Sequence, residues 1–345
     1  MTGGVAVEQT ACRDRRWPVS GCERLKYPRA DSSSMRFDVL GVDRSVSALF
    51  PPEVLLEKLG DLPVETVLID GDSETVASAR CDGVVTFEYR PALLECDWVH
   101  SVQAGVDRFP QERFREEGVL LTNSTGIHGD AIGETVAGYM LAFARRLHEH
   151  VANQESKRWS RPAWDEPWTI AGERACVVGL GSLGRGVVDR ATGLGLDVDG
   201  VRRTPVPEPG VDRVFTPDSL EAAVADARFV VLAVPLTPAT EEMIDADVLA
   251  AMREDAYLIN VARGSVVDQA ALVRALEDGE IAGAALDVFE TEPLPESSPL
   301  WEMDDVVVTP HAGSATRRYC DYVASLVAES VRRVREGEDP ANRVC

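Results

Sequence analysis

The chain has 345 residues, of which 45% are apolar and 27% are charged, and its formal net charge is −23. The apolar content excludes a disordered or fibrous protein, and the length fits one large domain or two ordinary ones. The longest apolar run, Phe229 to Leu236, falls well short of the roughly twenty residues that a membrane-spanning helix needs. So strong a negative charge also argues against nucleic acid and acidic membranes as partners.

The basic residues are almost all arginine, since only three of the 35 are lysines (Lys26, Lys58 and Lys157), against 58 Asp and Glu. We interpret this as the composition of a halophilic protein from a salt-rich cytoplasm. High ionic strength shortens the screening length to a few ångströms, which makes dense carboxylates tolerable. The alternative explanation is a GC-rich genome whose codons favour Arg and Asp.

The seven cysteines are odd in number and scattered, and they form neither a CxxC motif nor a Cys/His cluster. This pattern favours free thiols in a reducing compartment over a disulfide framework, and it predicts no metal site. The first thirty residues lack the apolar segment of a secretory signal. We therefore expect a cytoplasmic protein.

Residues 1–34 carry six bases and four acids, unlike the acidic remainder, and have no periodic apolar pattern. We expect them to be a disordered extension or the product of a mis-assigned start, with Met35 as the true beginning. Short apolar strands then alternate with helical patterns, which favours parallel strands joined by crossover helices. The strands are expected at residues 36–42, 66–69, 84–87, 98–103 and 120–122.

A long helix is predicted from Asp130 to the basic residues Arg145, Arg146 and His148, because both ends complement the helix dipole. A Pro- and Trp-rich connector follows at residues 159–168, and a second α/β series runs from Ala175 to about Thr309. The last helix, roughly residues 315–335, is too isolated to form a domain and is expected to pack back on the first lobe.

The predicted fold class is therefore α/β, with two Rossmann-like, doubly wound parallel-sheet lobes and a cleft between them. We assign residues 35–125 and 313–345 to a discontinuous substrate-binding lobe. Residues 126–312 are assigned to a dinucleotide-binding lobe.

A G-x-G-x-x-G turn formed by Gly179, Gly181 and Gly184 follows an apolar strand and opens a helix. The first glycine permits a tight turn, the second lets the backbone approach a pyrophosphate, and the third lets the helix pack close to the strand. The helix N-terminus would then face the phosphates. Glycines that serve only close packing are the alternative, but the flanking strand and helix favour a dinucleotide site.

Arg202 and Arg203 follow the second strand of this unit, where an NAD site usually has an acid that binds the ribose 2′-hydroxyl. Two guanidiniums at this place can bind a 2′-phosphate through charge-assisted hydrogen bonds. We therefore expect NADP(H) to be preferred, with NAD(H) also used. Solvated surface arginines are the alternative interpretation.

Three further segments place Arg263, Asp287, Glu292 and His311 just beyond apolar strands. Ligands of open parallel sheets bind beyond the carboxyl ends of the strands, so these residues could meet at one crevice. Arginine offers a planar fork to a carboxylate, and histidine can exchange a proton near neutral pH, helped by an adjacent glutamate. A surface ion pair for Arg263, a solvated Glu292 and a capping His311 are the structural alternatives.

With these features the chain resembles the D-isomer-specific 2-hydroxyacid dehydrogenases over roughly residues 36–345. It looks most like a haloarchaeal member of the glyoxylate/hydroxypyruvate-reductase-like branch. The resemblance rests on the dinucleotide turn and on four further ordered motifs: Val234-Pro-Leu-Thr237 with Thr240, Asn260-Val-Ala-Arg263-Gly264, Leu286-Asp-Val-Phe289 with Glu292-Pro293, and Thr309-Pro-His311.

The resemblance implies that Arg263 binds the carboxylate of a 2-oxo acid, with help from backbone amides near Ala104 and Gly105. It implies that His311 is the general acid in reduction, kept protonated by Glu292, and that Asp287 orients the nicotinamide carboxamide. The remaining residues that we expect at the cofactor are Gly179, Gly181, Ser182, Leu183, Gly184, Val234, Pro235, Thr240, Val261, Ala262 and Gly313, together with Arg202 and Arg203, which replace the acid of the NAD-preferring members. His128, near the expected hinge, is expected to be structural or to face solvent.

The expected reaction is reversible hydride transfer from NADPH to C2 of a 2-oxo acid, which gives a D-2-hydroxy acid. Ser314 stands where many members of the family carry a bulky aromatic residue, so more space is expected beside His311. A non-catalytic dinucleotide-sensing co-regulator and a formate- or phosphite-type dehydrogenase remain as alternatives. The long helix from Asp130 suggests a homodimer, as the resemblance also does.

Overall fold

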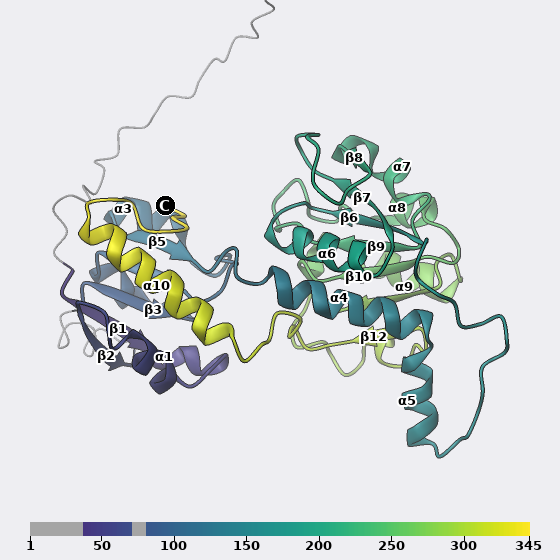
Figure 1. Ribbon diagram of the computed structural model, residues 1–345, viewed down its shortest axis with the longest axis horizontal. Coiled ribbons are helices and arrows are strands. Elements are labelled where there is room, and N and C mark those ends of the chain that lie inside the picture. Colours follow the sequence, from purple (N-terminus) through teal and green to yellow (C-terminus); the bar gives the residue numbers. More distant parts are fainter. Residues whose placement is uncertain (1–36, 71–80) are drawn as a thin grey trace, which may run out of the picture.

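The computed structural model describes residues 37–70 and 81–345, so the expectations for residues 1–34 lie outside the described residues. The described chain forms two α/β lobes that lie side by side, each built around a parallel sheet (Figure 1). These sheets confirm the predicted fold class of two Rossmann-like parallel-sheet lobes.

The first lobe contains a five-stranded sheet in the order β2-β1-β3-β4-β5. Its strands are β1 (Val39–Asp43), β2 (Glu65–Ile69), β3 (Gly83–Thr86), β4 (Trp98–Ser101) and β5 (Leu120–Asn123). The helices of this lobe are η2 (Arg44–Ala48), α1 (Pro52–Leu59), η3 (Pro91–Glu95), α3 (Gln111–Glu117) and α10 (Tyr319–Arg335).

The second lobe contains a seven-stranded sheet in the order β12-β11-β10-β9-β6-β7-β8. Its strands are β6 (Arg174–Val178), β7 (Asp197–Val201), β8 (Arg213–Phe215), β9 (Phe229–Leu232), β10 (Tyr257–Asn260), β11 (Gly283–Leu286) and β12 (Val306–Val308). The helices are α4 (Gly129–Ala144), α5 (Leu147–Glu155), α6 (Ser182–Gly193), η4 (Pro217–Ser219), α7 (Leu220–Val224), α8 (Ala246–Ala251), η5 (Gly264–Val266), α9 (Gln269–Glu277) and η6 (Pro299–Trp301).

The register of the second sheet brings the chemically active segments to one edge. Val178 pairs with both Val201 and Leu232, and Leu286 pairs with both Asn260 and Val308. Every residue of the central strand β9 is buried, as expected for a parallel sheet covered on both faces. The carboxyl ends of the strands are therefore level, and the segments that follow them begin at the same edge.

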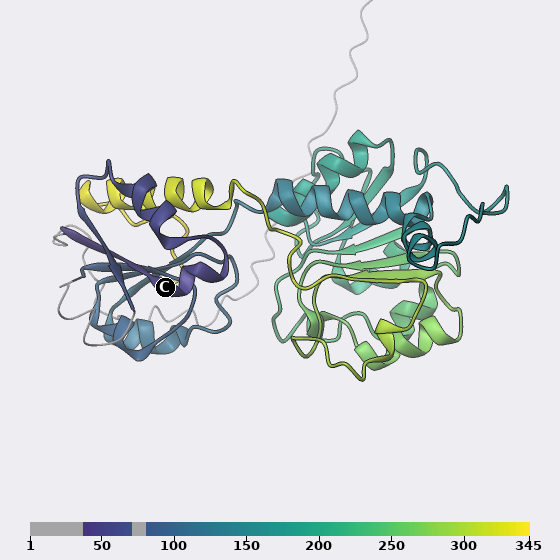
Figure 2. The same ribbon diagram turned by 90° about the horizontal axis from the view of Figure 1, so that it is seen from below.

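The last helix, α10, returns to the first lobe, where it lies along the first sheet (Figure 2). Its buried face includes Val323, Val327 and Val331, which belong to the same apolar cluster as Leu40 and Trp98 of the first sheet. Burial of this apolar stripe explains why an otherwise isolated amphipathic helix is stable.

Helix α4 packs against α6 through two glycines, because a side chain on Gly133 or Gly186 would collide with the backbone of the other helix. The apolar side chains that predicted this helix, such as Val136 and Phe143, are buried in the core of the second lobe. The apolar stripe of α4 therefore faces the core of its own lobe, and the homodimer that this helix suggested stays a prediction. The helix ends at Ala144, before His148, because Arg146 takes a left-handed φ of 53°.

Helix α5 and the connector that follows it project from the second lobe (Figures 1 and 2). This projection leaves Trp159 and Trp164 of the connector 98% and 92% exposed, and Leu147 and Val151 of α5 are also exposed. Within the described part of the chain, every helix is too short or too polar to cross a membrane.

Candidate active site

The glycine-rich turn joins β6 to α6 and is shaped to admit a ligand. Gly179 has a φ of +101°, and a Cβ atom there would lie 2.6 Å from the carbonyl oxygen of Ala233. Around Gly181, in contrast, a Cβ atom would meet nothing within 4 Å among the described residues. Ser182 and Leu183 are the first residues of α6, whose N-cap residue, Gly181, has no side chain with which to cap the helix. The first N–H groups of a helix have no partner within the helix, so they suit a pyrophosphate.

A cavity of about 430 Å³ opens beside this turn. Its walls include predicted cofactor residues from three segments: Gly179 and Gly181, Arg202 and Arg203, and Val234, Pro235 and Thr240. The Thr240 hydroxyl donates to the carbonyl of Pro235 at 2.6 Å and accepts from the N–H of Thr237 at 2.8 Å, so it shapes the third wall. The open turn, the uncapped helix and this cavity fit a dinucleotide.

The other predicted cofactor residues do not line this cavity. Gly184 packs against the carbonyl of Gly179, and Val261 and Ala262 are buried after β10. Gly313 donates its N–H to the Asp287 carboxylate at 2.8 Å.

The two arginines of the cofactor segment differ in their contacts. Arg202 donates to Oε2 of Glu208 at 3.0 Å, while Oε1 of the same carboxylate accepts from Nε of Arg185 at 2.8 Å. Arg203 is exposed and has no hydrogen bond or ion pair with any described residue. The sequence did not single out Glu208, because no local pattern links it to Arg202.

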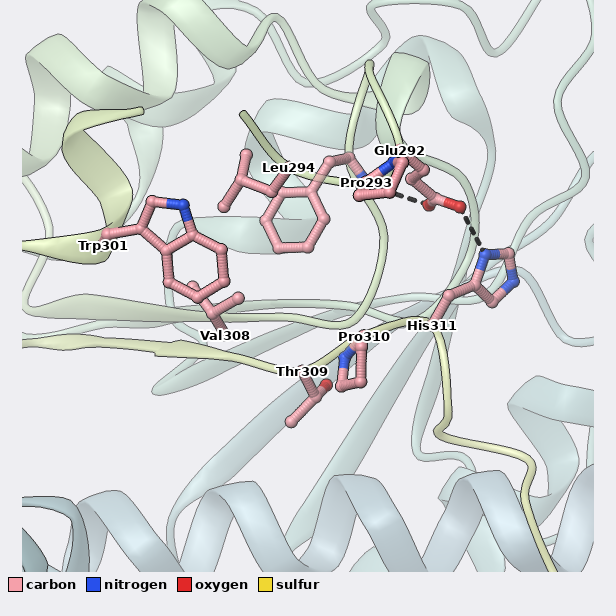
Figure 3. A pocket seen from close by; sticks show the side chains of 9 residues that line it. Glu292, Pro293, Leu294, Trp301, Val308, Thr309, Pro310 and His311 are labelled. Carbon is pink, nitrogen blue, oxygen red and sulfur yellow. Dashed lines mark hydrogen bonds and ion pairs between the residues drawn. The ribbon is translucent and has the colours of Figure 1, made fainter. Parts of the chain in front are cut away.

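His311 and Glu292 meet after β12 and β11, as the dashed line in Figure 3 shows. Nδ1 of His311 lies 2.8 Å from Oε2 of Glu292, and the other carboxylate oxygen accepts from the N–H of Phe289 at 3.1 Å. The backbone of His311 has a left-handed φ of 52°, and its N–H donates to the carbonyl of Asp287 at 2.8 Å. The imidazole is thus held through Nδ1, which leaves Nε2 as the nitrogen that can serve a substrate.

The carboxylate of Asp287 is buried and shapes the segment around His311. Oδ1 accepts from the Thr309 hydroxyl at 2.7 Å and from the N–H of Ala312 at 2.9 Å, while Oδ2 accepts from the N–H of Gly313. In this structure its protein contacts therefore hold the loop that carries the histidine. The resemblance also implies that Asp287 orients the nicotinamide carboxamide, and this role stays a prediction.

Arg263 lies where the two lobes meet. Its Nε donates to Oδ2 of Asp107 at 3.3 Å, and its guanidinium lies so close to Gly105 that a Cβ atom on that glycine would require the guanidinium to shift. The Asn260 side chain accepts from the N–H of Ala262 and donates to the carbonyl of Arg263, both at 3.0 Å, and so locks the turn after β10. No local pattern in the sequence assigns a role to these two residues, since Asp107 acts through its contact with Arg263 from the other lobe and Asn260 acts through the turn.

A cavity of about 240 Å³ between the lobes brings the predicted catalytic residues together. Arg263, Glu292 and His311 all line it, as do Gly105 and Asp107 from the first lobe. The predicted substrate residue Ala104 does not line it, and its carbonyl accepts from the Asn123 side chain at 2.6 Å.

A second cavity of about 520 Å³ lies beside the His311–Glu292 pair (Figure 3). Most of its wall is apolar and comes from the segments after β11 and around β12. The side chains drawn there include Leu294, Trp301 and Val308.

His128 lies in the segment that leads from the first lobe to α4, and it is buried. Its Nε2 lies 2.8 Å from the hydroxyl of Tyr319, which in turn donates to the carbonyl of Val102 at 2.9 Å. Burial, helped by the positive charge of Arg263, lowers the pKa of His128 to about 4. His128 therefore has a structural role, and it joins the two segments that cross between the lobes.

The family profile described as D-isomer specific 2-hydroxyacid dehydrogenase, NAD binding domain, matches residues 137–313. The chain belongs to this family. It is 34% identical to a glyoxylate reductase from Thermococcus kodakarensis, over 95% of this chain and 93% of the relative. This membership confirms the predicted function, NAD(P)-dependent oxidation and reduction at the CH–OH group of a 2-hydroxy acid, and it favours neither alternative.

Two solved structures extend the similarity to the whole fold. The first is a D-isomer specific 2-hydroxyacid dehydrogenase from Xanthobacter autotrophicus in complex with NADPH and MES. It has 30% identity and a TM-score of 0.73, over 90% of this chain and 98% of that one. The second is an NADPH-dependent glyoxylate/hydroxypyruvate reductase from Sinorhizobium meliloti in complex with citrate. It has 28% identity and a TM-score of 0.76, over 89% and 98% of the two chains.

Proposed function

We propose that this chain reduces small 2-oxo acids to D-2-hydroxy acids, with NADP(H) preferred over NAD(H). The observation that carries the proposal is the His311–Glu292 hydrogen bond of 2.8 Å at a cavity that Arg263 also lines. The modest volume of that cavity and the names of the relatives favour glyoxylate and hydroxypyruvate as the first substrates to test.

Each residue has a defined task in this reaction. When bound, the nicotinamide supplies the hydride that reaches C2 of the 2-oxo acid. Nε2 of His311 gives its proton to the carbonyl oxygen, so that a neutral hydroxyl forms rather than an alkoxide. Glu292 stabilises the imidazolium before the transfer, and the Arg263 fork binds the substrate carboxylate. Asp287 holds the loop in which His311 sits.

The lobes divide this work. Residues 126–312 would hold the dinucleotide, and residues 35–125 with 313–345 would supply the substrate loop. The glycine-rich turn in one lobe and the contact of Gly105 with Arg263 across the lobes support this division.

The test is NADPH oxidation, followed by absorbance, with a panel of 2-oxo acids. His311→Gln should remove most turnover and leave NADPH affinity unchanged, because a proton donor contributes in the transition state, typically about 100-fold or more. His150→Gln is a matched control, since His150 is exposed and far from the cavity residues in sequence. Normal kcat in His311→Gln would overturn the assignment.

Preference for NADP(H) is supported by the position of Arg202 and Arg203 on the wall of the dinucleotide cavity.

A homodimer is supported by the exposed apolar residues of α5 and the connector, which are Leu147, Val151, Trp159 and Trp164. Light scattering on a gel-filtration column should show a dimer in the unaltered chain. The double variant Trp159→Ser with Trp164→Ser should shift the measured mass toward that of the monomer. A dimer mass unchanged in this variant would show that this surface does not form the dimer interface.

A halophilic, cytoplasmic setting is supported by the net charge of −23 and by the described cysteines, which are free and mostly buried. Burial raises the pKa of Cys96 and Cys176 to about 12, so these thiols resist oxidation. Melting in low and in molar salt tests the halophilic part. Equal stability in both would reject it.

A further inference from the structure

Glu208 is the acidic residue that pairs with Arg202, the first of the two arginines on the wall of the dinucleotide cavity. Each of its carboxylate oxygens accepts from a different guanidinium, Oε2 from Arg202 and Oε1 from Arg185. Its side chain is 12% exposed, whereas that of Arg185 is 56% exposed. A carboxylate so covered, with both oxygens bonded to cations, is held in one position.

The backbone around Glu208 reinforces this position. Proline alternates with other residues at Pro205, Pro207 and Pro209, which restricts the loop before and after the carboxylate. Further along, the carbonyl of Glu208 accepts from the N–H of Val211 at 3.1 Å. The loop therefore returns Glu208 to the end of β7, beside the first arginine that follows this strand.

The charge balance at this wall of the cavity depends on Glu208. Arg202 and Arg203 both line the cavity, but Arg202 already shares its charge with Glu208, whereas Arg203 has no ion-pair partner among the described residues. A 2′-phosphate that approached Arg202 would meet the carboxylate as well as the guanidinium. The neutral 2′-hydroxyl of NAD(H) would feel no such repulsion.

We propose that Glu208 is a specificity-determining residue that weakens the preference for NADP(H) and keeps NAD(H) usable. This inference rests on the proposed function. Arg203 supplies an uncompensated positive charge for the 2′-phosphate. Glu208 offsets the positive charge of Arg202, so Arg202 contributes less to binding of the phosphate. Sequence alone could not show this, because the acid lies six residues beyond Arg202 in a loop with no regular structure.

The experiment measures the affinity of the intact protein for NADPH and for NADH by calorimetry, without substrate. Glu208→Gln keeps the size and a hydrogen-bond acceptor but removes the charge, so the Kd for NADPH should fall about tenfold and that for NADH should stay within about twofold. The gain should shrink in molar KCl, because screening weakens a Coulombic effect.

Asp218→Asn is the matched control. It removes the same unit charge from an exposed acid next to Pro217, another residue on the cavity wall, and Asp218 contacts no arginine among the residues that the structure describes. It should leave both affinities unchanged. Glu208→Ala should also tighten NADPH binding, because it removes the same charge. The thermal unfolding midpoints of Glu208→Ala and Glu208→Gln should match that of the unaltered chain, which shows that both variants are folded.

The outcomes separate the inference from the proposed function. If the unaltered chain binds neither cofactor, the proposed function fails and this inference fails with it. If it binds them and Glu208→Gln leaves the ratio of affinities unchanged, or weakens NADPH, only the inference is overturned. Weaker NADH binding would also overturn it, because Glu208 would then serve the ribose hydroxyls.

Discussion

His128 should stay neutral far below the pH at which an ordinary histidine takes up a proton. It is buried between the two segments that join the lobes, and its Nε2 is used by Tyr319. Its Nδ1 is also buried and has no hydrogen-bond partner among the described residues. A proton on Nδ1 would place a charge and an N–H without an acceptor in the interior, which is costly.

The size of the effect follows from the pKa of His128, which lies near 4 instead of the usual 6.5. In the folded chain the proton is disfavoured, so the unfolded chain takes it up first as the pH falls. The free energy of unfolding therefore keeps this contribution above about pH 6.5 and loses it between pH 6.5 and 4. At about 1.4 kcal/mol for each unit of pKa, the full contribution is roughly 3.5 kcal/mol, of which about 3 kcal/mol is lost by pH 4.

The assay compares the unaltered chain with His128→Gln, whose side-chain amide can still donate to Tyr319. Urea unfolding at pH 7 and at pH 4 should show the unaltered chain losing about 3 kcal/mol more than the variant. The chain has only five histidines, so NMR can follow each ring. The chemical shifts of the His128 ring should not change with pH at any pH above 5. The reasoning would be refuted if the free energy of unfolding fell equally with pH in the two proteins, or if the His128 ring titrated with a midpoint near pH 6.5.

Three further predictions concern the active site. Glu292→Gln should lower kcat at least about tenfold and leave the Kd for NADPH unchanged, because an amide cannot balance an imidazolium; steady-state kinetics with calorimetry tests this, and an unaltered kcat would contradict it. Arg263→Lys should raise KM for the 2-oxo acid about tenfold, since a point charge cannot replace a planar fork. Substrate titration at saturating NADPH measures that change, and an equal KM would count against a role in carboxylate binding. Arg202→Asp combined with Arg203→Ser should move the preference toward NADH, as measured by kcat/KM for each cofactor. An unchanged ratio would show that another group binds the 2′-phosphate.

The sequence by itself determined the fold class and the family, because both depend on local patterns. Alternating strands and helices, the spacing of Gly179, Gly181 and Gly184, and the residues that follow the strands are all visible along the chain. In a parallel sheet such residues necessarily come to the same edge, so the meeting of His311 with Glu292 could be expected.

Only the tertiary structure decided which charges share a site. Asp107 reaches Arg263 from the other lobe, Glu208 turns back onto Arg202, and the Asp287 carboxylate is used by the loop that carries His311. It also decided that the apolar stripe of α4 is covered by the chain itself, while α5 and the connector are left exposed. These contacts join segments that no local pattern links, because they depend on how the lobes and loops pack and not on the spacing of residues along the chain.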